Sequence, residues 1–387
     1  MKIGSSIVNQ CSLFIYMVCV AVLFMIWSLP TSLSVQPVSE NTFEGSSSLH
    51  SFTEITVPLP ENTSSLDESL PYIPHSTVQT WKERDYLIVF GIPSVDIDGR
   101  RRRRYLQRTT CWQFPGVARR ANNFTGAMLV LYVLARHPSK GYKYSESLLK
   151  EVAEYHDIIT LPINEGRSST NKTIGRNGYW GTEAEVGMGR KVFMWFEKAL
   201  KLFPHVSFIA KGDDDIFLRV PQFLYQLEML PRNGMYWGAI YAAKTRDFDI
   251  PIKYRFALGP CYTLSRDAAV QLVSYLPVKR LVYLPYSEKR LAEYAANYVN
   301  SEDMMVGYIL RKSNYHNKLV YFMERRCSFH DVHEGVRPEP VRRTSMMIHH
   351  LWESEYKEFM EMFGNDTNPL RRIWKKIARG RIEFYCR

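Results

Sequence analysis

At 387 residues the chain is long enough for two average domains or for one large α/β domain with a tail. Residues 1–80 hold one apolar run followed by Ser, Thr, Pro and Glu, whereas the rest mixes apolar and charged residues as a core does, which favours one large domain. The sequence has no internal repeat and no Gly-rich phosphate loop, which excludes repeat proteins and the common nucleotide-binding motifs. The net charge of +11 favours anionic ligands, or it serves solubility alone.

Residues 11–29 contain no charged side chain, and a helix of that length crosses the roughly 30 Å hydrocarbon layer of a membrane. Positive charge precedes this stretch and is absent for some fifty residues after it, so residues 1–10 are predicted to be a cytoplasmic tail. A cleaved signal peptide is the alternative, but its apolar region usually has only about 7–15 residues. We therefore expect a single-pass type II membrane protein with its main domain in a lumen, which contains no nucleic acid.

Residues 30–80 are a predicted disordered stem, because they are rich in Pro, Ser and Thr and poor in large apolar residues. The catalytic domain is then expected at residues 81–387. Four Asn-x-Ser/Thr glycosylation sequences agree with a secretory location: Asn62, Asn123, Asn171 and Asn365. Four of the six cysteines lie in the lumenal part and predict two disulfides, with three pairings open: Cys111, Cys261, Cys327 and Cys386.

Apolar runs and helical periodicity alternate along the domain. Runs typical of buried strands occur at 86–90, 127–134, 157–161 and 206–210. Helical spacing occurs at 145–155 and 183–203. Alternating strands and helices predict an α/β fold with a largely parallel central sheet, and ligands of such folds collect at the carboxyl ends of the strands.

An acidic triplet, Asp213-Asp214-Asp215, directly follows the apolar strand at 206–210 and the pair Lys211-Gly212. Unpaired carboxylates are costly between two apolar segments, and a hard divalent cation such as Mn²⁺ or Mg²⁺ would compensate them. Alternate residues of an extended segment point to the same side, so Asp213 and Asp215 are predicted to share one site. Asp215 is then the metal ligand, and Asp213 or Asp214 faces the ribose or a metal-bound water. A solvated turn is the alternative interpretation.

A second acidic pair, Glu302-Asp303, precedes an apolar helical stretch. The helix dipole alone accounts for acids in a first turn. In an active site, however, a carboxylate at a helix start can take the proton from an acceptor hydroxyl, and we predict Asp303 as this base with Glu302 as the alternate.

Histidines cluster near the C-terminus of the domain. His330 and His333 follow Cys327, but three such residues make a weak zinc motif, and a lumenal cysteine is more often in a disulfide. The neighbours His349 and His350 are both candidates for a non-carboxylate ligand that completes the metal site.

With these residues in view, the chain resembles the β-1,3-galactosyltransferase and β-1,3-N-acetylglucosaminyltransferase family, glycosyltransferase family 31, and within it the protozoan-parasite UDP-Gal or UDP-GlcNAc-dependent branch. The segment from Arg103 to Trp112 is similar to the family's Arg-rich segment, with Cys111 inserted. Further similar segments follow in the family's order: Glu154-Tyr155-His156-Asp157-Ile158-Ile159 with His156 in place of Gly, the motif at 211–217, the strand at 258–265, and Glu302-Asp303-Met304-Met305-Val306-Gly307 with Met304 in place of Val.

The resemblance implies a GT-A fold, an inverting mechanism and Mn²⁺ bridging the pyrophosphate of a UDP-sugar donor. It implies that Arg104, Arg108 and Asp157 contact the nucleotide, that the triplet serves metal and ribose, and that Asp303 is the base acting on a glycan acceptor of a glycoprotein or glycolipid. It also implies that the membrane of the type II anchor is that of the Golgi.

Two other classes compete with a transferase. A catalytically silent glycan-binding protein on the same fold would need no base, and a glycosidase would need two opposed carboxylates without a metal motif. The donor sugar and the acceptor depend on contacts that we expect from loops at 166–181 and 241–254.

Overall fold

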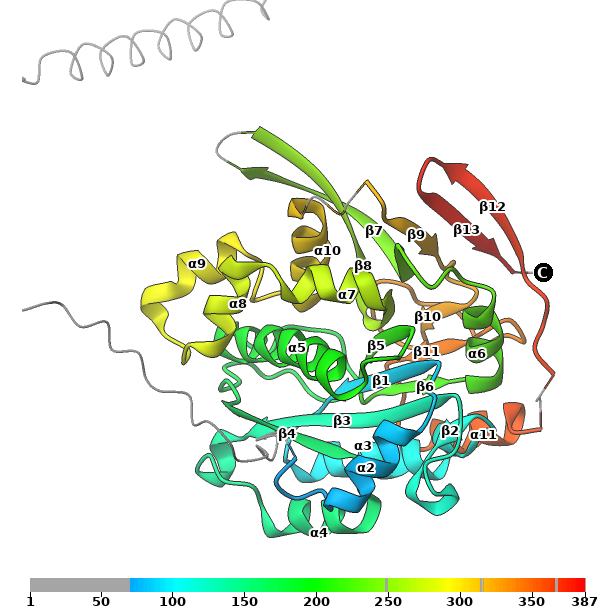
Figure 1. The fold of residues 1–387 in the computed structure, drawn as a ribbon, viewed down its shortest axis with the longest axis horizontal. Coiled ribbons are helices and arrows are strands. Elements are labelled where there is room, and N and C mark those ends of the chain that lie inside the picture. Colours follow the sequence, from blue (N-terminus) through cyan, green and yellow to red (C-terminus); the bar gives the residue numbers. More distant parts are fainter. Residues whose placement is uncertain (1–69, 248–249, 314, 316, 366–367, 387) are drawn as a thin grey trace, which may run out of the picture. The chain divides into compact units, whose positions relative to one another are not determined.

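The computed structural model describes residues 70–247, 250–313, 315, 317–365 and 368–386 (Figure 1). No helix within these residues is both long enough and apolar enough to cross a membrane. The predicted tail, the predicted anchor at 11–29 and most of the predicted stem lie outside the described residues.

The prediction of an α/β fold with a largely parallel central sheet is confirmed, in a sheet of mixed direction. β1 pairs in parallel with β3 and β5, while β8 joins β5 and β7 in antiparallel pairs. The strand order is β12-β13-β9-β7-β8-β5-β1-β3-β2, with β4 also on β3. The ten strands of this sheet are β1 (Ile88–Pro93), β2 (Val117–Ala118), β3 (Met128–Arg136), β4 (Ile158–Asn164), β5 (Phe208–Gly212), β7 (Met235–Asp247), β8 (Ile250–Ser265), β9 (Val320–Met323), β12 (Ile373–Ala378) and β13 (Arg381–Tyr385).

Helices cover both faces of this sheet. The two predicted helices are confirmed as α4 and α5, and Ser145 caps α4 by accepting a hydrogen bond from Leu148 N at 3.1 Å. The α-helices of the described residues are α2 (His75–Glu83), α3 (Asp98–Thr109), α4 (Glu146–Tyr155), α5 (Thr182–Leu202), α6 (Val220–Glu228), α7 (Arg266–Val273), α8 (Leu276–Tyr283), α9 (Leu291–Ala296), α10 (Glu302–Lys312) and α11 (Glu355–Phe363).

Neighbouring residues of β1 face opposite sides of the sheet and contact different layers. Phe90 packs on Trp112 and Phe223, with ring centroids 5.9 Å apart in both pairs. Gly91 faces Trp195 of α5, and a Cβ at this position would lie 2.1 Å from the indole ring. Figure 1 shows α5 on one side of the sheet and α3 on the other. The close approach of α5 therefore requires glycine at position 91.

The folded body begins earlier than the predicted boundary at residue 81. Leu70, Ile73 and Trp81 are buried in the core; Ile73 lies just before α2, and Trp81 lies within it. Burial of these apolar side chains ties residues 70–80 to the domain, so they are not part of a disordered stem.

The segment 241–254, which we expected to be a loop, is mostly strand. It forms the facing ends of β7 and β8, paired from Tyr241 with Phe256 to Asp247 with Ile250. These residues are held as strands by the backbone hydrogen bonds between β7 and β8. The sequence did not reveal this, because such pairing does not require local apolar periodicity.

One of the two predicted disulfides is present, between Cys327 and Cys386. The prediction of a second was wrong, because Cys111 and Cys261 are free thiols buried in the core. Burial raises the pKa of the Cys111 thiol to about 12, so this thiol stays protonated and unreactive at neutral pH.

We expect loss of the Cys327–Cys386 disulfide to lower the free energy of unfolding by about 4 kcal/mol, because the closed loop spans 59 residues and its entropy in the unfolded chain is then restored. Urea unfolding of the full-length protein with and without dithiothreitol measures this change. The double variant Cys327→Ser/Cys386→Ser is the control, since the reductant should have no effect on it. An equal response of the variant and the wild type to reductant would contradict the assignment.

Candidate active site

A small second sheet brings the acidic turn and the C-terminal histidines together. Its strands are β6 (Ile216–Leu218), β10 (Phe329–Asp331) and β11 (Met347–His349), in the order β10-β11-β6. β11 runs antiparallel to β6 and parallel to β10, so His349 lies opposite both Ile216 and Asp331. The pairing carries His349 beside the turn at 213–215 although more than 130 residues of chain separate them.

The carboxylates of the acidic turn point to two sides. Asp213 Oδ2 lies 3.7 Å and Asp215 Oδ1 3.2 Å from Nε2 of His349. Asp214 points to the other side, where Ser94 Oγ donates to it at 2.6 Å and Arg100 forms an ion pair with it. The expected alternation is therefore present, and two of the three carboxylates face one imidazole.

Asp331 completes the surroundings of the two histidines. Its Oδ1 lies 2.7 Å from Nδ1 of His349 and 3.4 Å from Nδ1 of His350. His350 has a left-handed φ of 60°, and its Nδ1 hydrogen-bonds to the carbonyl oxygen of Glu334. The structure thus brings both histidines to the site, but it places only His349 against the acidic turn.

Electrostatics at His349 favour a cation. Burial opposes protonation of His349, but the carboxylates of Asp215 and Asp331 outweigh it and raise the pKa of the imidazole to about 10. Burial also opposes ionisation of Asp215, yet His349 and Arg100 hold the pKa of that carboxyl well below its usual range. The carboxylates around His349 therefore stabilise a positive charge, either on the imidazole or on a bound cation.

The donor set fits a hard or borderline divalent cation. One potential ligand atom each from Asp213, Asp215 and His349 lie within 4.8 Å of one another, and so do those of Asp331, His349 and His350. Carboxylate oxygens suit the hard cations Mn²⁺ and Mg²⁺, and neither group contains a thiolate, the ligand type of soft metal sites. The first group includes Asp215 and His349, two of the three predicted ligands, and metal binding by any of these residues stays a prediction.

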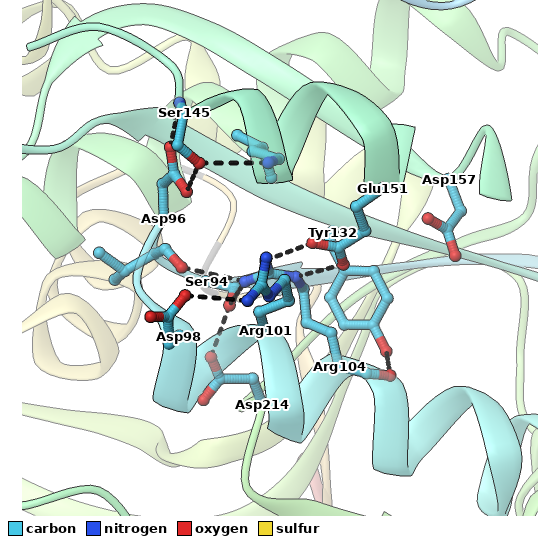
Figure 2. A network of polar contacts seen from close by, with 12 residues as sticks. Ser94, Asp96, Asp98, Arg101, Arg104, Tyr132, Ser145, Glu151, Asp157 and Asp214 are labelled. Atoms are coloured by element: carbon cyan, nitrogen blue, oxygen red, sulfur yellow. Dashed lines mark hydrogen bonds and ion pairs between the residues drawn. The ribbon is translucent and has the colours of Figure 1, made fainter. Parts of the chain in front are cut away.

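A buried polar network runs from Asp214 away from the turn (Figure 2). Arg104 donates from Nη1 to Ser94 Oγ at 2.9 Å and from Nε and Nη2 to Glu151 at 2.8 and 2.7 Å. Arg108 donates to Glu151 at 2.6 Å and twice to Asp157 at 2.8 Å. The network therefore connects the acidic turn with α3, α4 and the start of β4.

The residues predicted to contact the nucleotide have different exposures in this network. Arg104 has no exposed surface, and its donors go to Ser94, Val95 and Glu151. Asp157 is 17% exposed and borders a separate cavity with Arg108. Arg104 supports the end of β1 from within, and direct contact of any of the three with a nucleotide stays a prediction.

Glu302 and Asp303 at the start of α10 have unequal access. The buried Glu302 accepts hydrogen bonds from Lys211 Nζ and Tyr262 OH, both at 2.7 Å, and burial raises its pKa to about 7. Asp303 accepts from Ser301 Oγ at 3.1 Å and from Met304 N at 2.7 Å, and burial raises its pKa. Of the two, only Asp303 borders the cavity next to His349. The predicted base needs such access in order to reach an acceptor hydroxyl.

Two cavities flank the acidic turn. The larger, of about 270 Å³, is bordered by Asp213, Asp303 and His349, and the smaller, of about 110 Å³, by Arg100 and all three aspartates. Lys172, from the loop between β4 and α5, borders both. The acidic turn thus lies between the smaller cavity, which Arg100 and Lys172 border, and the larger cavity, which the candidate base Asp303 borders.

The other sequence features have structural places. His330 is buried against Ser345 Oγ at 2.8 Å, and His333 stacks on Trp352, so no zinc site forms with Cys327. His156, where the resembling family has Gly, has a left-handed φ of 53° at the end of α4, a conformation that glycine adopts without strain. Met304, the third departure, donates its amide to Asp303.

Sequence reasoning missed three residues of this site. Lys211 neutralises Asp213 and Glu302 at 2.6 and 2.7 Å, Arg100 neutralises Asp214, and Asp331 holds His349. The position of Lys211 in an apolar strand just before the acidic turn was a usable signal, since a buried lysine needs a carboxylate partner. Asp331 gave no comparable signal, because strand pairing alone brings it to His349.

Comparison with known proteins gives a limited similarity. No known family profile matches the chain. Over 160 residues the chain is 26% identical to lactosylceramide 1,3-N-acetyl-beta-D-glucosaminyltransferase of Rattus norvegicus; the match covers 37% of this chain and 38% of the length of that relative. Among solved structures, HddC from Yersinia pseudotuberculosis has 11% identity over 49% of this chain and 80% of its own, with a TM-score of 0.23 that is too low to establish a common fold. The chain is thus a distant relative of a glycosyltransferase.

Proposed function

We propose that the protein is an inverting, metal-dependent hexosyltransferase of the β-1,3-glycosyltransferase family that moves galactose or N-acetylglucosamine from a UDP-sugar to a glycan hydroxyl, with β-1,3 linkage and a GT-A fold. The observation that carries the proposal is the placement of Asp303 on the same cavity as Asp213 and His349. A binding protein needs no candidate base across a cavity from a candidate metal site. The distant similarity to a glycosyltransferase supports the same class.

The chain's own residues suggest how the reaction would proceed. Arg100 and Lys172, which border the smaller cavity, would attract the diphosphate of the donor. Asp303 would take the proton of the acceptor hydroxyl while the hydroxyl oxygen attacks the anomeric carbon of the donor sugar from the face opposite UDP. A single displacement of this kind inverts the anomeric configuration and forms no covalent intermediate with the enzyme.

Asp213, Asp215 and His349 would hold Mn²⁺ or Mg²⁺, with His350 as the further candidate. When bound, such an ion supplies Lewis-acid stabilisation of the charge on the departing diphosphate. Lys211 pairs with Oδ1 of Asp213 and Arg100 pairs with Oδ1 of Asp214. Oδ2 of Asp213 and Oδ1 of Asp215 face His349.

The proposed setting is the lumen of the Golgi, with the chain held to the membrane by residues 11–29. The disulfide Cys327–Cys386 supports an oxidising compartment. Asn123, Asn171 and Asn365 are exposed, as N-glycosylation requires.

A panel of UDP-sugars tests the proposal. We expect full-length protein with Mn²⁺ to release UDP from one of UDP-galactose or UDP-N-acetylglucosamine in the presence of glycan acceptors, and EDTA to abolish the release. Sugar release from glycans without UDP-sugar would indicate a glycosidase. Binding of glycans by folded protein that neither turns over nor binds any UDP-sugar would replace the transferase by a glycan-binding protein.

A further inference from the structure

A separate cavity of about 290 Å³ lies where β4 ends and α5 begins, next to the end of α8. Its walls include Arg136 and Arg190, the carboxylates of Glu165 and Glu183, and the rings of Tyr283 and Tyr286. None of its lining residues borders either cavity beside the acidic turn. Its ligand would therefore not be the donor diphosphate of the proposed reaction.

Two arginines of this cavity lack a carboxylate partner among the described residues. Arg190 is only 3% exposed, and its Nε donates to the carbonyl oxygen of Val282 at 2.8 Å. Arg136 reaches the carbonyl oxygen of Pro162 at 3.4 Å, and its buried Nε has no hydrogen-bond partner within the described part of the chain. A buried cation without an ion-pair partner is costly: burial lowers the pKa of Arg190, and the carboxylate of Glu165 offsets this effect only in part.

The carboxylates nearby compensate these cations only in part. Glu165 forms an ion pair with Lys191, a residue with no exposed surface that also donates to Ser94 O at 2.7 Å. Glu183 forms no ion pair with Arg136 or Arg190 in the described structure. Lys191 does not line the cavity, but it neutralises Glu165 from behind, so Arg136 and Arg190 face only the carboxylate of Glu183 as a free counter-charge, and the cavity has room for one further negative charge.

Tyrosine rings surround these charges. Tyr286 stacks on Tyr294 with ring centroids 5.9 Å apart, while Tyr283 is 48% exposed at the rim. Tyr142 and Arg136 line both this cavity and an adjoining cavity of about 390 Å³. Tyr72 and Tyr144 line the adjoining cavity as well. Aromatic faces with hydroxyl groups at their edges suit a ligand that has apolar CH faces and many hydroxyls, and the two adjoining cavities suit more than one sugar ring.

We propose that this cavity binds a sugar residue carrying an anionic group, a carboxylate or a sulfate, within a glycan, with Arg136 and Arg190 on the anion and the tyrosines on the sugar rings. The assignment rests on charge balance and lining, and it holds whether or not the proposed transferase activity is found. Arginine suits this role because its planar fork of donors matches the oxygens of a carboxylate or sulfate.

Titration calorimetry on the full-length protein tests the site with sialyllactose, N-acetylglucosamine 6-sulfate, neutral lactose and inorganic sulfate as probes. We expect one of the charged sugars to bind, and Arg190→Met to weaken its affinity about ten- to hundredfold through loss of charged hydrogen bonds. The matched control is Arg379→Met, which removes an exposed arginine between β12 and β13 and should leave the affinity unchanged. Which charged sugar binds distinguishes the carboxylate from the sulfate.

Three results would overturn the proposal. They are equal affinity for lactose and the charged sugars, inorganic sulfate binding as tightly as the sulfated sugar, and unchanged affinity of Arg190→Met. That variant should melt no lower than wild type, because it removes a buried cation without a partner. If it unfolds instead, the premise about Arg190 is wrong, and unchanged affinity of Arg136→Gln would then remove the site altogether.

Discussion

Turnover by the Asp303→Asn variant is expected to fall by about two to four orders of magnitude, while its affinity for UDP stays as in wild type. The amide oxygen of Asn can still accept the hydrogen bond from Met304 N, so the start of α10 should keep its conformation. What the variant loses is a proton acceptor on the cavity that Asp213 and His349 also border. Steady-state kinetics of UDP release, together with UDP titration, separates the two effects.

The neighbouring Glu302→Gln variant is the matched control. Glu302 is held by Lys211 and Tyr262 within the protein, so its replacement should reduce turnover less than replacement of Asp303. A larger loss in Glu302→Gln would transfer the role of base to Glu302. Equal turnover of Asp303→Asn and wild type would remove the base from the mechanism.

The affinity for Mn²⁺ is expected to rise about tenfold per pH unit between pH 6 and 9, because binding at His349 must displace one proton. The sign follows from the raised pKa of His349, about 10: the imidazole is protonated throughout this window, and each rise in pH lowers the cost of removing that proton. Titration of the full-length protein followed by electron paramagnetic resonance of free Mn²⁺ measures the affinity at each pH.

Variants of the two histidines identify the ligand. Burial lowers the pKa of His350, so this residue is less protonated than a free imidazole in the same window, and His350→Gln should keep the slope. His349→Gln should lose both most of the affinity and the slope. The reverse pattern would make His350 the ligand, and a pH-independent affinity in wild type would contradict the protonated His349.

Local pattern was enough to predict most of the elements that carry the site. Residues 206–210 are apolar except for Ser207, and the buried strand β5 (Phe208–Gly212) occupies this region with the acidic turn at its carboxyl end. The spacing of Asp213 and Asp215 predicted a common side, since side-chain direction alternates along any extended chain. Such features depend only on the neighbouring residues, which the sequence contains in full.

Pairing between distant residues could not be predicted in this way. The partner of Cys327 was open among three connectivities, and Asp331 was not considered beside His349. Arg104 and Arg108 were expected at a nucleotide, yet Glu151, a residue of α4 that the sequence does not mark, binds both. A basic run on a helix does not reveal which of its members face the interior.

The sequence by itself determined the α/β alternation, the acidic turn after β5 and the distinct composition of residues 1–80, because apolar periodicity and charge act on adjacent residues. Only the tertiary structure decided that His349 and not His350 meets Asp213 and Asp215, and that Asp303 and not Glu302 borders the cavity. It also decided that Arg136 and Arg190 have no ion-pair partner among the described residues. These outcomes depend on strand register and on burial, which arise when segments far apart in the chain exclude water from one another.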